Sequence, residues 1–183
     1  MKNFIIRTLS GLAFTILVIG SILYGPVAFA VVFGTIMTIA VSEYLNITVG
    51  KSNAGGNILL RALTIVASLS LFVNVFIVAA YGFDPLYILF AILPVLGIFI
   101  SNLYVKGFNV HDIKEVDGVA VRTSNGYESH PFALGALVYV ALPFSLMSIV
   151  LYDKTGVYDG NLLLCMMVML WCTDVGAYLL GST

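Results

Sequence analysis

The chain has 183 residues, of which 61% are hydrophobic and only 9% are charged. An average soluble domain carries about 25% charged residues. The 8 Lys and Arg and 9 Asp and Glu are too few to cover the exterior of a soluble fold of this size. The net charge of −1, without a basic stripe, argues against a nucleic-acid partner. Composition therefore predicts an all-α, polytopic integral membrane protein.

Six apolar runs have about the length needed to cross a bilayer, which takes about 20 residues. They are apolar all round rather than on one stripe, as expected of helices surrounded by lipid or by other helices. We therefore expect a single transmembrane domain over residues 1–183 with about six helices. The runs cover residues 8–24, 26–47, 60–82, 85–105, 132–152 and 161–181.

Turn and breaker residues mark the ends of several runs. Gly25-Pro26 joins the first two as a tight helical hairpin, because Pro is favoured in the first turn of a helix. Asp84 is a natural N-cap for the fourth run, which Pro85 opens. Pro94 and Pro143 fall inside runs, where we expect them to kink the helices.

The basic residues predict the orientation in the membrane, because cytoplasmic connections are enriched in Lys and Arg. With the N-terminus in the cytoplasm, seven basic residues are inside and only Lys154 is outside. A cleaved secretory signal ending at residues 28–30 is an alternative for the N-terminus. Cleavage there would leave an apolar new end, so a retained hairpin is favoured. The inside residues are Lys2, Arg7, Lys51, Arg61, Lys106, Lys114 and Arg122.

The one long polar connection is the predicted cytoplasmic loop 106–131. It is either a solvated loop, with or without a short surface helix, or part of a binding surface for a charged substrate or lipid headgroup. On the second interpretation Arg122 is our candidate substrate-binding residue in it. Cys165 and Cys172 lie about 10 Å apart along one predicted helix, too far for a disulfide between them, so we expect two reduced, buried thiols.

Asp174 is the most informative residue, because it lies inside the last apolar run, about 10 Å along the helix from the expected cytoplasmic end. Acids within a membrane usually face a partner or a wet cavity. Asp174 is therefore either a ligand for a cation or proton carrier, or an acid solvated near the interface or hydrogen-bonded to another helix. Helical spacing places Ala177, Tyr178 and Gly181 on the same face. Glu43 is a second candidate for the same crevice, although interfacial solvation also explains it.

Residues Trp171–Gly181 (WCTDVGAYLLG) resemble the W-x-x-D-T-G-A-Y-x-x-G element of phosphatidate cytidylyltransferases, also called CDP-diacylglycerol synthases. Val175 replaces the usual Thr of that element. The resemblance implies that Asp174 is the catalytic metal ligand, and that Tyr178 and Gly181 line the substrate cavity.

Weaker similarities to the same family extend along the whole chain. Arg7–Gly11 is similar to the family's opening, and Glu43-Tyr44 to a Glu-aromatic pair that follows it. Leu134–Tyr139 (LGALVY), followed by Pro143, resembles the Gly- and Tyr-containing span before the main element.

The resemblance implies transfer of a cytidylyl group from CTP to phosphatidate, giving CDP-diacylglycerol and pyrophosphate for phospholipid biosynthesis. The implied cofactor is Mg²⁺, with a second cation as an open alternative, and the partners are CTP, phosphatidate and bilayer lipids. It also implies a prokaryotic inner membrane with the site facing the cytoplasm. Whether the chain forms a homo-oligomer is left open.

The family continues past this element into further spans and a Lys-, His-, Gly- and Asp-rich signature, which residues 1–183 do not contain. We therefore expect little or no activity from this chain alone. An ion-coupled transporter or channel subunit, with Asp174 as a cation or proton site, is the main alternative function. A structural membrane protein and a CTP-dependent lipid kinase are two others.

Overall fold

The computed structural model describes residues 2–49, 55–104, 113–116, 119–122, 130–153 and 155–181. The predicted all-α membrane fold is confirmed, since helices make up nearly all of the described residues. The first three helices are α1 (Lys2–Tyr24), α2 (Pro26–Thr48) and α3 (Gly55–Tyr81). A 3₁₀ segment, η1 (Pro85–Ala91), then leads into α4 (Ile92–Tyr104). The next span consists of α5 (His130–Ala136), the π-helical η3 (Leu137–Ala141) and α6 (Leu142–Val150), and α7 (Asn161–Gly181) follows.

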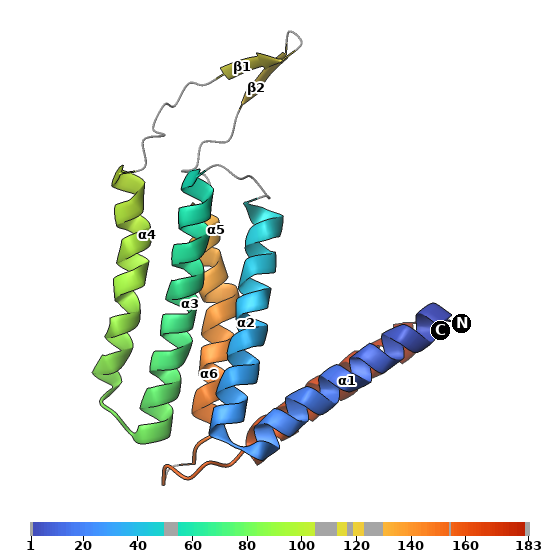
Figure 1. Cartoon of the computed structure of the whole chain (residues 1–183). Helices are drawn as coiled ribbons and strands as arrows, with labels where there is room; N and C mark the ends of the chain where they lie inside the picture. The colour runs from blue at the N-terminus through green and yellow to red at the C-terminus, as the bar shows by residue number, and fades with distance from the viewer. Residues whose placement is uncertain are drawn as a thin grey trace.

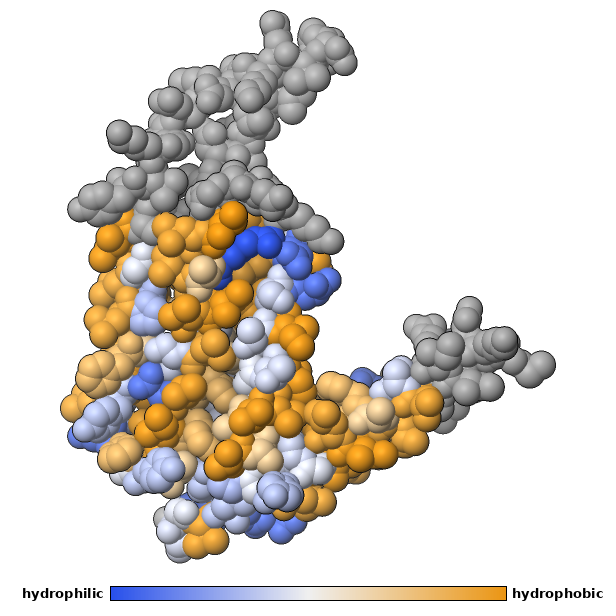
Figure 2. Space-filling view, in the orientation of Figure 1, coloured by the Kyte–Doolittle hydropathy of each residue, from blue (hydrophilic) through white to orange (hydrophobic). Residues whose placement is uncertain are grey.

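Three of the described helical segments are long and apolar enough to cross a membrane: Pro26–Thr48, Ile58–Tyr81 and Pro131–Val150. Shorter apolar helical stretches lie within the other three runs, at Leu9–Tyr24, Pro85–Ile100 and Asn161–Ala177. Many large apolar side chains on these helices are exposed, as a lipid-facing surface requires. Figure 2 shows that apolar residues cover most of the visible surface of the described helices.

The helices form a bundle with two helices leaving it. In Figure 1, α2, α3, α4 and the α5–α6 span run side by side, and α3 contacts all the others. Helices α1 and α7 leave one end of this bundle in the same direction, so both chain termini lie far from it. The link between α1 and α2 is Gly25 alone, as the predicted hairpin requires, but the two helices diverge beyond it.

Part of loop 106–131 forms a small β-hairpin rather than the surface helix that we considered. Strands β1 (Ile113–Val116) and β2 (Val119–Arg122) pair antiparallel, with Ile113 opposite Arg122 and Val116 opposite Val119. β-branched residues occupy four of the eight strand positions, which favours extended backbone over a helix. The hairpin lies beyond the end of the bundle where α4 ends and α5 begins (Figure 1).

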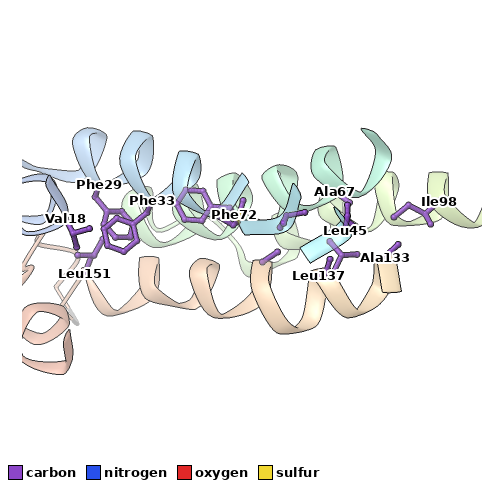
Figure 3. Packing of buried hydrophobic residues seen from close by; sticks show 14 of the residues in the cluster. Val18, Phe29, Phe33, Leu45, Ala67, Phe72, Ile98, Ala133, Leu137 and Leu151 are labelled. Atoms are coloured by element: carbon purple, nitrogen blue, oxygen red, sulfur yellow. The ribbon is translucent and has the colours of Figure 1, made fainter. Parts of the chain in front are cut away.

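The core is aromatic at one end and aliphatic at the other (Figure 3). Phe29 stacks on Phe33 with ring centroids 4.2 Å apart, and lies 6.3 Å from Phe72 of α3. Towards the other end of the bundle small residues, Ala67, Ala133 and Ala136, are completely buried and let the helices approach closely. The core therefore joins α2, α3 and the α5–α6 span.

Four hydroxyl side chains are buried in this bundle. Those of Thr64, Ser68 and Ser145 each donate to the carbonyl oxygen four residues earlier, at 2.7, 2.8 and 2.7 Å. The Ser148 hydroxyl has no partner among the described residues. Small polar residues are common at helix interfaces in membranes, because their hydroxyls can hydrogen-bond to the backbone of their own helix while the two helices stay close together.

The predicted helix-breaking residues all lie at changes in helix geometry. Beside Pro94 and Pro143, however, the structure has a 3₁₀ and a π segment in place of the expected kinks. Asp84 caps η1 by accepting the Leu86 N–H at 3.0 Å, with Pro85 next to it. Pro94 lies just after the change from 3₁₀ to α geometry, and Pro143 just after the π-helical η3. A proline has no N–H for the preceding turn, so the hydrogen-bond pattern changes beside it instead of producing a simple bend.

The connection between α6 and α7 is a tight turn ordered by Asp153. One carboxylate oxygen, Oδ1, accepts the Thr155 hydroxyl at 2.6 Å and the backbone N–H groups of Thr155 and Val157 at 2.8 and 2.9 Å. Gly156 has a φ of 77°, which favours glycine. Tyr152 and Tyr158 pair across the turn as an antiparallel bridge. The turn holds the start of α7 against the bundle.

We expect protonation of Asp153 to loosen this turn. The hydrogen bonds from the Thr155 side chain and the Val157 backbone lower the pKa of Asp153. Because the pKa of Asp153 is lower in the folded protein than in the unfolded chain, its ionised form stabilises the fold at pH values above the ordinary Asp pKa. This stabilisation is lost as the pH falls through the pKa of the folded protein. In a carboxyl ¹³C titration the midpoint of Asp153 should lie below the ordinary Asp value, and Thr155→Val should raise it. A midpoint unchanged by Thr155→Val would contradict the assignment.

Both cysteines are free, as predicted, but their expected burial is wrong. Cys165 and Cys172 are exposed, because α7 leaves the bundle and few of its side chains are covered.

Candidate functional site

The candidate site residues on α7 lie in its last two turns. Asp174, Ala177 and Gly181 are all exposed there, and the side chain of Tyr178 lies outside the described residues. A β-carbon added at Gly181 would meet no other atom within 4 Å. The carboxylate of Asp174 is therefore open to a ligand approaching from outside the helix.

A polar cluster lies at the far end of α2, where α3 begins. Arg61 donates to the Asn46 side-chain oxygen at 2.9 Å and to the Leu45 carbonyl oxygen at 3.2 Å. The Asn46 amide reaches the exposed carboxylate of Glu43 at 3.5 Å. A cation at the carboxyl end of a helix satisfies its last carbonyls and interacts favourably with the helix dipole. Arg61 thus fixes the end of α2 that presents Glu43.

Next to Glu43, the Tyr44 side chain packs on the backbone of α5. A β-carbon at Gly135 would lie 2.6 Å from the Tyr44 hydroxyl oxygen, closer than real carbon atoms approach. Glycine at 135 therefore allows α2 and α5 to come together at this end of the bundle. Gly135 of the Leu134–Tyr139 segment and Tyr44 of the Glu-aromatic pair are structural partners.

The structure does not bring all the predicted site residues together. Asp174 lies towards the free end of the diverging α7, and Glu43 lies at the opposite end of α2 from the point of divergence (Figure 1). Arg122 is the last residue of β2, and its side chain lies outside the described residues. The shared crevice expected for Asp174 and Glu43 is absent from this arrangement.

Asp174 and Glu43 are thus two exposed carboxylates that lie in different parts of the fold. The described residues contain no cluster of three or more His, Cys, Asp or Glu side chains able to hold a metal. Mg²⁺ does not need such a cluster, since it is commonly held by one or two carboxylates together with substrate phosphates. The exposed Asp174 fits a site of that kind.

Sequence reasoning missed Arg61 as a site-building residue and counted it only as a charge for orientation. Its position three residues before Thr64, the first buried hydroxyl of α3, gives no sign of a partner on α2, fifteen residues earlier. The Asn46-to-Arg61 spacing across a polar connection was the only available signal.

Comparison with known proteins gives the family. Residues 5–183, almost the whole chain, match the cytidylyltransferase family. No curated protein and no solved structure matches the chain. The resemblance seen in the sequence is confirmed at the level of the family. Membership of this family supports cytidylyl transfer, a nucleotidyltransferase reaction. The chain belongs to the cytidylyltransferase family.

Proposed function

We propose that this chain is part of a phosphatidate cytidylyltransferase, which makes CDP-diacylglycerol for phospholipid biosynthesis in a prokaryotic inner membrane. The observation that carries the proposal is the WCTDVGAY sequence on α7 with its carboxylate exposed, in a chain that matches a cytidylyltransferase family over residues 5–183. The apolar exterior of the helices supports a substrate that enters from the bilayer.

The reaction joins two anions. An oxygen of the phosphatidate phosphate forms a bond to the α-phosphorus of CTP, and the bond from that phosphorus to the β-phosphate oxygen breaks. Pyrophosphate leaves with the electron pair. Charge repulsion between the reactants must be screened and their phosphates aligned for this displacement.

The residues of this chain would supply part of that environment. Asp174 would hold a Mg²⁺ ion, whose chemistry is to neutralise phosphate charge and orient the nucleotide. Tyr178 and Gly181 follow Asp174 at helical spacing and would contact substrate, and Arg122 would contribute a positive charge from the loop. Arg61 and Asn46 support the end of α2 that presents Glu43.

The test is an assay in membranes that contain the longest reading frame beginning with these 183 residues. Labelled CTP and phosphatidate should give CDP-diacylglycerol and pyrophosphate in equal amounts, and chelation of Mg²⁺ should abolish the product. The isolated 183 residues serve as a second sample in the same assay. If a folded protein makes no CDP-diacylglycerol with Mg²⁺ present, the substrate assignment is wrong.

A further inference from the structure

We propose that α2 and α3 form a site for one ethanolamine phospholipid of the bilayer. One acyl chain would lie in a groove between the two helices, and the headgroup would bind at the cluster of Glu43, Asn46 and Arg61. The site is independent of the proposed function, because its occupant is a lipid other than the substrate. Three features of the described residues support it: the groove, the direction in which its walls lead, and the two charges at its end.

An open groove lies on one side of α2, next to α3. It has a volume of about 370 Å³ and is lined by α2 from Ala30 to Ile39, together with Leu69 of α3. Thr35 and Thr38 line it as well, and their hydroxyls donate to carbonyl oxygens of α2 itself, both at 2.7 Å. These two donors are therefore satisfied within the helix, and the groove presents an apolar surface to its occupant.

The depth and size of the groove fit an acyl chain. It lies near the middle of Pro26–Thr48, one of the segments that are long and apolar enough to cross a membrane. At that depth the molecules around an exposed side of the bundle are the hydrocarbon chains of lipids. Sites for whole small molecules have volumes of about 300–1,000 Å³, so a groove at the lower end of this range holds one chain rather than a complete lipid.

The α2 wall of the groove leads to Asn46. Helical steps of three and four residues continue the face of Thr35 and Thr38 to Ser42 and then to Asn46. The Ser42 hydroxyl also donates to its own helix, to the Ile39 carbonyl oxygen at 2.7 Å. Asn46 lies about 17 Å along the helix from Thr35, close to the roughly 15 Å depth of one leaflet of the bilayer core. A lipid whose chain ends in the groove therefore has its headgroup at the level of Asn46.

The α3 wall leads to the same place. Helix α3 runs antiparallel beside α2 (Figure 1), and steps of four residues continue the face of Leu69 through Ile65 to Arg61. Arg61 donates to the Asn46 side-chain oxygen at 2.9 Å, so the two walls are joined at this end. The groove is therefore apolar along its length and polar where it meets the end of α2.

The polar cluster carries one charge of each sign. Arg61 donates to the oxygen of the Asn46 amide, so the nitrogen of that amide faces Glu43, whose carboxylate it reaches at 3.5 Å. The guanidinium and the carboxylate thus lie at the two ends of one side-chain amide. Glu43 is exposed and Arg61 is half-buried, so both are at the surface where a headgroup would lie.

A zwitterionic headgroup with a primary ammonium matches this pair of charges. The lipid phosphate is attracted to the Arg61 guanidinium, and the ethanolamine ammonium donates to the Glu43 carboxylate. A headgroup that is only anionic, such as that of phosphatidate, would place its phosphate beside the Glu43 carboxylate, and like charges side by side are unfavourable. A choline headgroup carries the positive charge but has no N–H to donate. The chemistry of the cluster therefore favours ethanolamine.

Native mass spectrometry of the full chain in detergent tests the site without an activity assay. Lipids that have the same acyl chains and carry ethanolamine, choline, glycerol or unsubstituted phosphate headgroups are titrated in turn. We expect the first ethanolamine lipid to bind with a Kd about tenfold lower than the choline lipid, a difference that one charge-assisted hydrogen bond can supply. Glu43→Gln should remove this preference and leave the binding of the choline lipid unchanged, which also shows that the variant is folded.

Thr35→Phe tests the groove. Thr35 is exposed, so the larger ring can be accommodated on α2 but occupies the space of the acyl chain. The affinity for the first lipid should fall by about tenfold with every headgroup, because the chain loses its packing contacts. Leu96→Phe is the matched control, since Leu96 is 48% exposed on α4, across α3 from α2 (Figure 1), and its lipid affinity should equal that of the unchanged protein.

Four results would overturn the proposal. An ethanolamine preference that survives Glu43→Gln would reject the headgroup assignment, and unchanged lipid binding in Thr35→Phe would reject the groove. Tightest binding of phosphatidate would mean that the occupant is the proposed substrate. A dimer that persists at saturating lipid and is lost in Thr35→Phe would mean that a second copy of the chain occupies the groove. None of these results depends on whether the protein makes CDP-diacylglycerol.

Discussion

Asp174→Asn is expected to lower cytidylyl transfer to phosphatidate by about 10²- to 10³-fold, the range found when one preorganised electrostatic group is removed from an active site. Asparagine keeps the size and the helix, but it removes the charge that would hold Mg²⁺. The measurement is the initial rate of CDP-diacylglycerol formation in membranes, over a range of Mg²⁺ concentrations. Partial recovery at high Mg²⁺ would support a weakened metal site.

Thr173→Ala is the matched control for that variant. Its hydroxyl donates to the Met169 carbonyl oxygen within α7 at 2.8 Å, so its loss should leave the rate close to that of the unchanged protein. Equal losses in both variants would mean that α7 tolerates no change in this turn, and would remove the case for Asp174 as a ligand. An unchanged rate in Asp174→Asn would leave the family assignment but reject this site.

Phe29→Ala is expected to lower the free energy of unfolding by about 3 kcal/mol, the lower end of the usual range for a buried Phe. Phe29 is 0% exposed and packs between Phe33 and Phe72, so truncation leaves a cavity that rigid neighbouring helices cannot fill. In a bilayer the loss is mainly of dispersion contacts, which explains the choice of the lower end. Denaturant titration in mixed micelles measures it.

Phe90→Ala provides the comparison, because the Phe90 side chain is 55% exposed at the end of η1. Its unfolding free energy should change by no more than about 0.5 kcal/mol. A similar loss at both positions would show that aromatic content, rather than the Phe29–Phe33–Phe72 packing, stabilises the bundle.

Helix positions could be read from the sequence because a spanning segment must satisfy its backbone internally and cover itself with apolar side chains. Gly25, Asp84 and Pro85 then marked the boundaries through local backbone preferences. The direction of α1 after Gly25 could not be read in the same way, because a glycine permits many link geometries. The β-hairpin could not be predicted either, because the polar loop sequence shows no clear alternation of apolar and polar residues.

The candidate site could be predicted only in part. Asp174 was identifiable because an acid in an apolar run is costly and needs a reason. The contact between Arg61 and the end of α2, and the approach of Tyr44 to Gly135, depend on how two helices pack, which single-helix spacing does not determine. The separation of Glu43 from Asp174 depends on the same packing.

The π-helical segment Leu137–Ala141 gives the fifth span an extra residue in one turn. Buried positions recur every four residues there, at Leu137, Ala141 and Ser145, a spacing that drifts around an ordinary α-helix. The wider π turn cancels that drift and keeps the row straight. The two halves of the span are therefore phased independently. A one-residue deletion within 137–141 would let this turn return to ordinary α geometry with Gly135 still against Tyr44 and Ser145 still buried, so this segment absorbs a residue that a regular helix of this span could not hold.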